Sequence, residues 1–422
     1  MNVYKFGGAS VKDVASIKKI SKLLGDATQP LIIVISAMNK TTNALEALTE
    51  AYFTRETAKA QAIFQDISSY HNEIHDELCG KDQTGNPPAY VGVLNFLENK
   101  LHQPPSLNYD YEYDQIVPCG ELMSTHIISD YLKNDGVDLQ WTDARDIIRT
   151  DNAYRQANVD WDTSREAFRR HISALRKTII TQGFIGSTPE GINTTLGREG
   201  SDYTAAILAV LAGAEDVTIW KDVPGVMNAD PKEFSFSEKL PLISYQEAIE
   251  LAYYGAKVIH PRTIKPLENK KIPLYVKSFV DPGSDGTVIR RVKDDVKLAP
   301  VYIVKDKQVL MSISPRDFSF IMEKHISHIF DVFDQYNAHV SVSQNSAISF
   351  SVCFSCDKRK LPGLIKKLSE NFKVLYNENL LLITIRHFTD EAVKKMLSGK
   401  EVILEQRSRN TARFVVRDMT KH

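Results

Sequence analysis

The sequence predicts an α/β protein with a mainly parallel sheet covered by helices on both faces, followed by a smaller region with an antiparallel sheet. Short apolar runs such as Leu31–Ser36 and Val217–Trp220 alternate with helix-like stretches, which is typical of strands buried on both faces. After the turn-rich segment Asp281–Gly286 the pattern changes and strands of alternating polarity appear. We therefore expect one domain over residues 1–283 and a second over residues 284–422.

The elements of the first domain follow from periodicity and turn residues. A strand at Val3–Tyr4 leads through two glycines into a helix, because apolar side chains recur at helical spacing from Val11 to Leu24. We expect a helix over residues 42–78 and a loop over 80–88. The remaining expected elements are strands at Ile179–Ile185, Val217–Trp220 and Pro273–Val276 and helices at Ser201–Leu211 and Tyr245–Tyr254.

The second domain is predicted to have its elements in the order βαββαβ, with helices on one face of its sheet. Its expected strands are Val301–Val304, Val309–Ser314, His339–Phe354 and Leu380–Ile385, with helices around Ile326–Phe333 and Leu361–Leu368. A partial copy follows, with a helix at Glu391–Leu397 and strands at Val402–Glu405 and Ala412–Val416. The chain ends before a second helix of that copy, so we expect the copy to be truncated.

Composition excludes several classes of function. The chain has 422 residues, is 43% hydrophobic and carries a net charge of −1, so no bulk charge attracts it to nucleic acid or to a membrane. No signal sequence is apparent, and no apolar run approaches the roughly 18 residues that cross a bilayer. A cytoplasmic location is expected.

The four cysteines are too few for a disulfide framework, and Cys353 and Cys356 are expected where a strand runs into a turn.

The segment Lys5-Phe-Gly-Gly-Ala-Ser10 has the chemistry of a polyphosphate cradle. Two glycines let the backbone approach a phosphate closely, the N–H groups that follow favour an anion, and Lys5 adds a positive charge. A tight turn without a ligand explains these residues equally well when they are taken alone.

The densest group of polar residues lies at Thr194–Thr204, directly before an expected helix. Here Ser201 is expected as the N-cap, and Arg198 can bind a carboxylate or a phosphate through two parallel hydrogen bonds. Asp202 could hold a metal or a lysine. A capped helix with a surface arginine is the alternative.

Three further turns carry candidate residues. Glu121 is expected at a strand-to-helix turn, where it can receive an ammonium group or simply cap the helix. Trp220–Val226, continued to Pro231, could enclose a base and a ribose, and Lys257 is expected at a helix end within reach of phosphate oxygens.

Several common motifs are absent or rejected. The sequence has no P-loop and none of the protein-kinase signatures. His71 and His75 are four residues apart, but the glutamate between them is one place away from the zinc-protease position, so we expect an exposed helical face. The basic residues Lys358–Lys360 are expected in a solvated turn.

Taken together, the motifs resemble those of the aspartate kinase family over essentially the whole chain. They are Lys5-Phe-Gly-Gly-Ala-Ser-Val11, Ser36-Ala-Met38, Thr42-Asn43, Gly120-Glu-Leu122, Gln182–Gly186, Thr195–Thr204, Trp220–Gly225, Asp230-Pro231 and Gly255–Pro261. The resemblance implies an amino-acid kinase fold followed by two ferredoxin-like ACT domains, one inserted in the other, over about 307–379 and about 297–306 plus 380–422. It also implies use of ATP and Mg²⁺, a homodimer or larger assembly through the ACT domains, and the first step of lysine, threonine and methionine synthesis.

The resemblance further implies a role for each matching residue. Lys5, Arg198 and Asp202 would be catalytic, and Thr42, Glu121, Arg198 and Ser201 would bind L-aspartate. Lys5, Gly7, Gly8, Ser10, Lys221, Asp222, Met227, Lys232 and Lys257 would contact ATP, with Mg²⁺ carried by the phosphates rather than by a protein site. The chain departs from the family at Ala9, Lys221 and Met227, which puts the adenine contacts in doubt.

The expected regulatory site is unusual. Lysine-sensitive relatives pair a glycine-containing loop with acidic groups, whereas this chain has Met322–Ile326 without glycine, followed by Ser341, Gln344 and Ser346. A buried ammonium without a carboxylate partner is costly, so we expect weak lysine inhibition, with threonine as the alternative effector. An ACT-domain amino-acid sensor with little catalytic activity is the alternative function.

Overall fold

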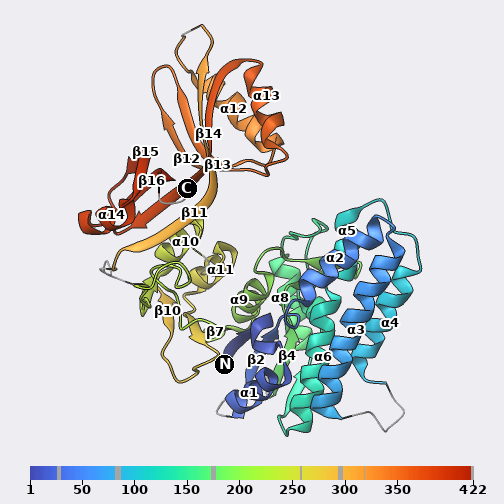
Figure 1. Cartoon of the computed structure of the whole chain (residues 1–422). Coiled ribbons are helices and arrows are strands. Elements are labelled where there is room, and N and C mark those ends of the chain that lie inside the picture. Colours follow the sequence, from blue (N-terminus) through green and yellow to red (C-terminus); the bar gives the residue numbers. More distant parts are fainter. Residues whose placement is uncertain are drawn as a thin grey trace. The chain divides into compact units, whose positions relative to one another are not determined.

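The computed structural model of the protein describes residues 1–25, 30–80, 87–172, 177–256, 259–292, 298–317 and 319–419. The chain divides into two compact units, each with its own sheet (Figure 1). The first unit comprises Met1–Val226, Lys239–Ala252 and Lys257–Val296, and the second comprises Met227–Glu238, Tyr253–Ala256 and Lys297–His422. Two short segments of the N-terminal part of the chain therefore belong to the second unit.

The first unit is built on an eight-stranded sheet in the order β3-β4-β2-β1-β7-β9-β10-β8. Its strands are β1 (Asn2–Phe6), β2 (Leu31–Ile35), β3 (Leu139–Trp141), β4 (Thr178–Gln182), β7 (Asp216–Lys221), β8 (Leu242–Ser244), β9 (Leu274–Ser278) and β10 (Thr287–Arg290). All neighbouring strands run parallel except β10, which is antiparallel to β9. A short hairpin, β5 (Ile185–Ser187) and β6 (Asn193–Thr195), follows β4. The predicted mainly parallel sheet is confirmed.

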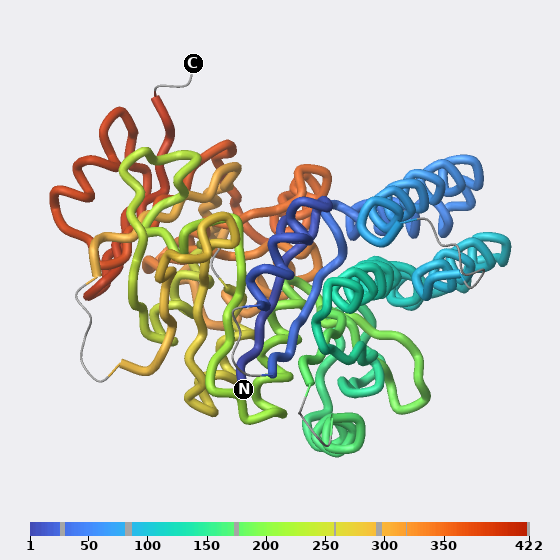
Figure 2. Tube along the Cα trace, turned by 90° about the horizontal axis from the view of Figure 1, so that it is seen from below, coloured from blue at the N-terminus to red at the C-terminus, as the bar shows by residue number. Residues whose placement is uncertain are grey.

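Helices cover both faces of this sheet. They are α1 (Val14–Gly25), α2 (Thr41–Phe53), α3 (Thr57–Cys79), α4 (Ala89–Leu101), α5 (Tyr109–Ile116), α6 (Cys119–Asn134), α7 (Ala144–Ile147), α8 (Trp161–His171), α9 (Gly200–Ala212), α10 (Tyr245–Tyr254) and α11 (Pro261–Lys270), with a 3₁₀ turn η1 at Gly8–Val11. Figure 2 shows α2 and α3 in blue beside α4 and α6 in cyan and green, and these helices pack on one another.

The alternation of β1 decides which of its side chains face the site. Phe6 packs into the large apolar core that α1, α3 and α6 form on one face of the sheet. Lys5, its neighbour, points to the opposite face, because successive side chains of a strand alternate. Helix α9 packs against β1, β2 and β7, and it carries Asp202, the ion-pair partner of Lys5.

The second unit contains a six-stranded antiparallel sheet in the order β12-β13-β11-β14-β16-β15. Its elements are β11 (Val301–Pro315), α12 (Glu323–Gln335), β12 (His339–Asn345), β13 (Phe350–Ser355), α13 (Leu361–Ser369), β14 (Phe372–Arg386), α14 (Asp390–Leu397), β15 (Lys400–Arg407) and β16 (Thr411–Asp418). The first six of these follow the predicted βαββαβ order. The long strands β11 and β14 pair along their whole length and join the two halves of the sheet.

Four predictions differ from the structure. The two expected strands Val301–Val304 and Val309–Ser314 form one strand, β11, which pairs with β14 on both sides of a bulge near Gln308. Residues 42–78 form two helices, because the chain turns at Thr54–Glu56, where Arg55 has a positive φ of 60°. Ile179–Ile185 is interrupted at Phe184, whose φ is 72°. His339–Phe354 is a β12–β13 hairpin rather than one strand, because the chain reverses between Asn345 and Phe350 and the two strands pair antiparallel.

The histidine pair was also predicted wrongly. His71 and His75 are buried in α3, with 0% and 5% exposure, because α2, α4 and α6 pack around this helix. Burial lowers the pKa of His71 to about 4, although its Nδ1 lies 2.7 Å from the carbonyl oxygen of Ile67. His71 is therefore neutral and belongs to the core.

Other predictions about small features are confirmed. Cys353 lies in β13 and Cys356 directly after it, and both are free thiols. Lys358–Lys360 form an exposed turn. In the part of the chain that the structure describes, no helix is both long and apolar enough to cross a membrane.

Candidate active site

A cavity of about 900 Å³ opens in the first unit, where four parallel strands end. Its wall includes residues that directly follow β1, β2 and β4, together with Lys221 at the end of β7. Crevices at the carboxyl ends of parallel strands are the usual ligand sites of α/β sheets. The cavity also reaches the first turns of α2, α6 and α9.

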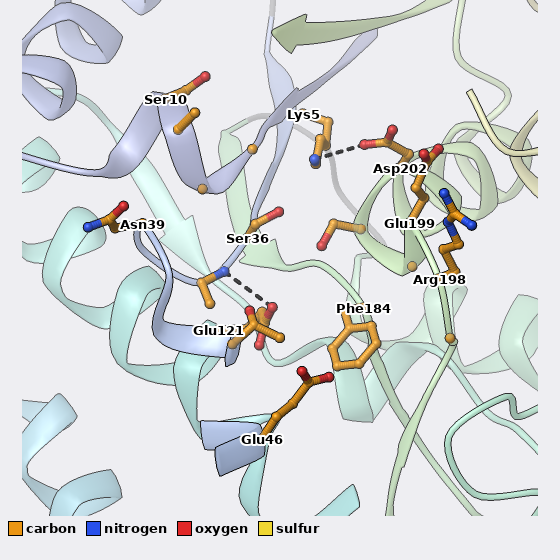
Figure 3. A pocket seen from close by; sticks show the side chains of 18 of the residues that line it. Lys5, Ser10, Ser36, Asn39, Glu46, Glu121, Phe184, Arg198, Glu199 and Asp202 are labelled. Carbon is orange, nitrogen blue, oxygen red and sulfur yellow. Dashed lines mark hydrogen bonds and ion pairs between the residues drawn. The ribbon is translucent and has the colours of Figure 1, made fainter. Parts of the chain in front are cut away.

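Two lysines share one carboxylate at one end of this cavity. Lys5 Nζ lies 2.8 Å from Asp202 Oδ1, as Figure 3 shows. Lys221 Nζ lies 3.5 Å from Asp202 Oδ2. Burial alone would raise the pKa of Asp202, but the two lysine charges outweigh it and hold the pKa below its ordinary value. The cluster therefore keeps a net positive charge, which suits a phosphate.

The glycine turn after β1 is tightly packed. A Cβ on Gly8 would lie 2.8 Å from the carbonyl oxygen of Asn39 and 2.9 Å from that of Ala37. The Asn39 N–H donates to the Gly8 carbonyl oxygen at 3.1 Å, so the turns after β1 and β2 are locked together. Gly8 is thus required by this packing as well as by any approach of a phosphate.

Glu121 presents a buried carboxylate to the same cavity. It lies in the first turn of α6 and is 2% exposed. Its Oε1 accepts from the Ala37 N–H at 3.2 Å, whereas its Oε2 has no hydrogen-bond partner among the described residues. Burial raises the pKa of Glu121 to about 8, although the Ala37 hydrogen bond lowers it. A cationic ligand would satisfy the unpaired oxygen. The predicted strand-to-helix turn is wrong in one respect, because α5 rather than a strand precedes this helix.

Helix α9 begins differently from the prediction. Its N-cap is Glu199, in the left-handed conformation with φ 53°, and Ser201 is already inside the first turn. Gly183 faces Ser201 so closely that a Cβ on Gly183 would lie 2.4 Å from the Ser201 Cβ. Arg198 precedes the N-cap and is exposed. Figure 3 shows it beside Glu199 on the α9 side of the cavity.

The structure brings most of the predicted site residues together. Those that line the cavity are Lys5, Gly7, Gly8, Ser10, Thr42, Glu121, Arg198, Ser201, Asp202, Lys221 and Asp222. Met227 and Lys232 belong to the second unit, and Lys257 lies outside the described residues. The predicted effector residues Ser341 and Gln344 lie on β12, and Ser346 follows in the hairpin turn. Ser341 is half-buried and the other two are exposed.

Sequence reasoning missed one wall of the cavity. Tyr113 donates its hydroxyl to Glu46 Oε1 at 2.7 Å, and the Arg155 guanidinium lies 4.6 Å from the centre of the Tyr113 ring. Arg155 also pairs with Asp110 at 3.1 Å. Glu46 could have been found, since it lies one helical turn after Thr42. Arg155 carries no such signal, because it lies in an irregular loop.

Comparison with known proteins places this site in a family. The model of the amino acid kinase family matches residues 1–278. Lysine-sensitive aspartokinase 3 of Escherichia coli is 30% identical over 416 residues, covering 95% of this chain and 89% of that protein. The chain belongs to the aspartokinases of the amino acid kinase family. Bifunctional aspartokinase/homoserine dehydrogenase 1 of Arabidopsis thaliana is also 30% identical, over 88% of this chain, and this aspartokinase spans only 42% of that longer protein.

Solved structures agree with this family. The crystal structure of E. coli aspartokinase III in complex with aspartate and ADP has a TM-score of 0.81 and 27% identity, and the match covers 99% of this chain and 96% of that one. The structure of the same enzyme with lysine and aspartate has a TM-score of 0.79, also at 27% identity, over 100% of this chain and 96% of that one. Both likenesses extend over the two units of this aspartokinase.

Proposed function

We propose that this aspartokinase transfers the γ-phosphoryl group of ATP to the β-carboxylate of L-aspartate and forms 4-phospho-L-aspartate, the first step of lysine, threonine and methionine synthesis. The observation that carries the proposal is that one cavity holds both an unpaired carboxyl oxygen suited to an ammonium group and a positive cluster suited to phosphate. The unpaired oxygen of Glu121 faces a space that also holds the positive Lys5–Asp202–Lys221 cluster. E. coli aspartokinase III binds aspartate and ADP in a structure of similar fold.

Glu121 and Arg198 would hold the amino-acid end of the substrate. The substrate ammonium would donate to Glu121 Oε2, which removes the cost of a buried oxygen without a partner. Arg198 forms no hydrogen bond or ion pair with the described residues, so its guanidinium would bind the α-carboxylate. Thr42 and Ser201 would add hydrogen bonds from the first turns of α2 and α9.

The phosphoryl end needs positive charge rather than a base. The β-carboxylate of aspartate has a pKa near 4 and is already ionised at neutral pH, so catalysis reduces to positioning and neutralisation of charge. Lys5 and Lys221, held by Asp202, would neutralise the oxygens of the transferring group. Gly7, Gly8 and Ser10 would supply the adjoining backbone and hydroxyl groups.

ATP would bring Mg²⁺ with it, which supplies further neutralisation of the phosphate charges. Among the described residues no group of three His, Cys, Asp or Glu side chains could hold a metal ion. The Asp202 carboxylate is engaged by two lysines, which fits a metal held mainly by the nucleotide. We assign Lys221 and Asp222 to the nucleotide from their place on the cavity wall, and Met227, Lys232 and Lys257 from the sequence resemblance.

The second unit would be the regulatory region. Its β11-α12-β12-β13-α13-β14 order suits one ACT domain, and the outer halves of β11 and β14 with α14, β15 and β16 suit the second. We propose that this region forms homodimers or larger assemblies and binds an amino-acid effector. E. coli aspartokinase III has been crystallised with lysine, which supports a lysine-type ligand as one possibility and threonine as the other.

The proposal is tested by following ADP release with L-aspartate as acceptor, with trapping of the acyl phosphate by hydroxylamine. Aspartate-dependent ADP release with an equal amount of hydroxamate is expected. ADP release without hydroxamate would contradict the proposal. Intact Lys5, Glu121, Arg198 and Asp202 around one cavity favour the enzyme over an ACT sensor with little activity. A large rise in the KM for aspartate in the Arg198→Ala variant would show that the cavity is the reaction site.

A further inference from the structure

Asp114 is a fully buried carboxylate next to the active-site cavity, and the proposed chemistry does not use it. It lies on α5 and is 0% exposed. Its two oxygens accept hydrogen bonds from two other parts of the chain. Burial raises the pKa of Asp114 to about 6 even though these hydrogen bonds lower it, so the group is ionised at neutral pH and acts only as an acceptor.

The first partner is Thr195, at the end of β6. Its N–H donates to Asp114 Oδ2 at 2.8 Å, and its hydroxyl donates to Asp114 Oδ1 at 2.7 Å. Thr195 is only three residues before Arg198. Asp114 therefore fixes the point from which the chain runs toward the guanidinium that is proposed to bind the substrate α-carboxylate.

The second partner is Arg155, whose backbone N–H lies 3.1 Å from Asp114 Oδ1 and 3.0 Å from Oδ2. Arg155 has a φ of 67°, a conformation that a residue other than glycine adopts only when its surroundings hold it there. Its carbonyl oxygen would lie 3.1 Å from a Cβ on Gly197, and Gln156 Cγ would lie 3.2 Å away. The loop that Asp114 holds is thus packed directly on the residue before Arg198.

Two further hydrogen bonds hold the turn between Thr195 and Arg198. The Leu196 N–H donates to the Phe184 carbonyl oxygen at 2.8 Å, and Arg262 Nη1 donates to the Leu196 carbonyl oxygen at 3.1 Å. The backbone up to residue 197 is therefore fixed, while the Arg198 side chain stays free for a ligand.

We propose that Asp114 is a positioning residue that acts through Arg198: by binding Thr195 and Arg155 it sets the place of the Arg198 guanidinium and so the affinity for the substrate α-carboxylate. This inference rests on the proposed function. It assigns no contact between Asp114 and substrate. An amide at this position would turn one acceptor into a donor that faces backbone N–H groups, so Asp114→Asn should displace the turn without changing the size of the side chain.

The test is a double-mutant cycle with Asp114→Asn, Arg198→Ala and the double variant, measured in the full-length chain. Asp114→Asn should raise the KM for aspartate at least about tenfold and leave the KM for ATP within about twofold. In the Arg198→Ala background the same change should have no further effect on the KM for aspartate, because the residue through which Asp114 acts is already gone. Equal effects of Asp114→Asn in both backgrounds would show a merely structural role and overturn the inference.

Glu112→Gln is the matched control. Glu112 lies on the same helix, is equally buried, and binds Lys100 at 2.7 Å and the Ser106 N–H at 2.7 Å, and it does not line the cavity. The Glu112→Gln variant should lose stability without a selective rise in the KM for aspartate.

If Asp114→Asn does not fold, Thr195→Val replaces it in the test. This change removes only the hydroxyl hydrogen bond to Asp114 and should raise the KM for aspartate about threefold. A wild-type protein without aspartate-dependent turnover would instead contradict the proposed function itself.

Discussion

Lys5 on β1 and Asp202 on α9 form a buried ion pair of 2.8 Å in the cavity where the parallel strands of the first unit end. The side chains are only 10% and 4% exposed, and Lys221 lies 3.5 Å from the second oxygen of the same carboxylate. Asp202 therefore fixes two ammonium groups without cancelling both charges. This excess of one positive charge, next to the glycine turn, is what the proposed transfer of a phosphoryl group requires.

Replacement of Lys5 by Met should abolish most of the activity. The variant keeps the length of the side chain but removes stabilisation of the transferring group that is worth on the order of 3 to 4 kcal/mol, so kcat should fall at least about a hundredfold. Lys100→Met is the control, because Lys100 also pairs with a buried carboxylate, Glu112, at 2.7 Å. Both variants should lose thermal stability, but only Lys5→Met should lose kcat. If the kcat of Lys5→Met stays within about threefold of the wild-type value, Lys5 and the glycine turn do not bind the transferring phosphoryl group.

The KM for aspartate should depend on pH through Glu121. Its pKa of about 8 in the free protein means that the carboxyl is mostly protonated at neutral pH. A substrate ammonium favours the ionised form, so binding below pH 8 must release this proton. The KM should therefore fall as the pH rises from 6 to 8 and level off above pH 8. Steady-state rates of wild type and Glu121→Gln across this range decide the point, since the variant should show a higher KM that lacks this dependence on pH.

Gly183→Ala should damage the site through packing alone. The new Cβ would lie 2.4 Å from the Ser201 Cβ and 2.8 Å from the Ser201 Cα, so the first turn of α9 must shift. Because Asp202 lies in this turn, both the ion pair with Lys5 and the activity should suffer. Gly213→Ala offers a comparison at the other end of α9, where nothing lies within 4 Å but φ is 61°. It should cost stability of order 1 kcal/mol and leave kcat near wild type.

The local pattern was sufficient to predict many of these elements, and long-range packing explains the rest. Strand β2 and helix α9 were predicted because apolar runs and helical spacing are local properties. The burial of His71 and the contact of Arg155 with Tyr113 depend on segments distant in sequence. The N-cap was predicted wrongly for a related reason. Glu199 adopts a conformation that its residue type does not indicate, and tertiary contacts such as its bond to the His260 N–H at 2.8 Å help to hold it.

Regulation by lysine should be weak. The β12–β13 region offers the neutral side chains of Ser341, Gln344 and Ser346 rather than carboxylates to an ammonium group. Initial rates across lysine and threonine concentrations, singly and together, should show weak inhibition by lysine, with threonine as the alternative effector. Submillimolar inhibition by lysine alone would mean that another part of the regulatory region supplies the carboxylate.

The proposed transfer to L-aspartate is tested by the ratio of kcat/KM for L-aspartate to that for L-glutamate in the wild-type protein. Glu121 and Arg198 would hold the ammonium and the α-carboxylate at one end of the substrate, so one extra methylene in its side chain would displace the attacking oxygen relative to the Lys5–Lys221 cluster. Aspartate should be preferred at least about a hundredfold, with ADP formed in proportion to phosphorylated aspartate. Comparable kcat/KM values for the two acids would contradict the proposed transfer.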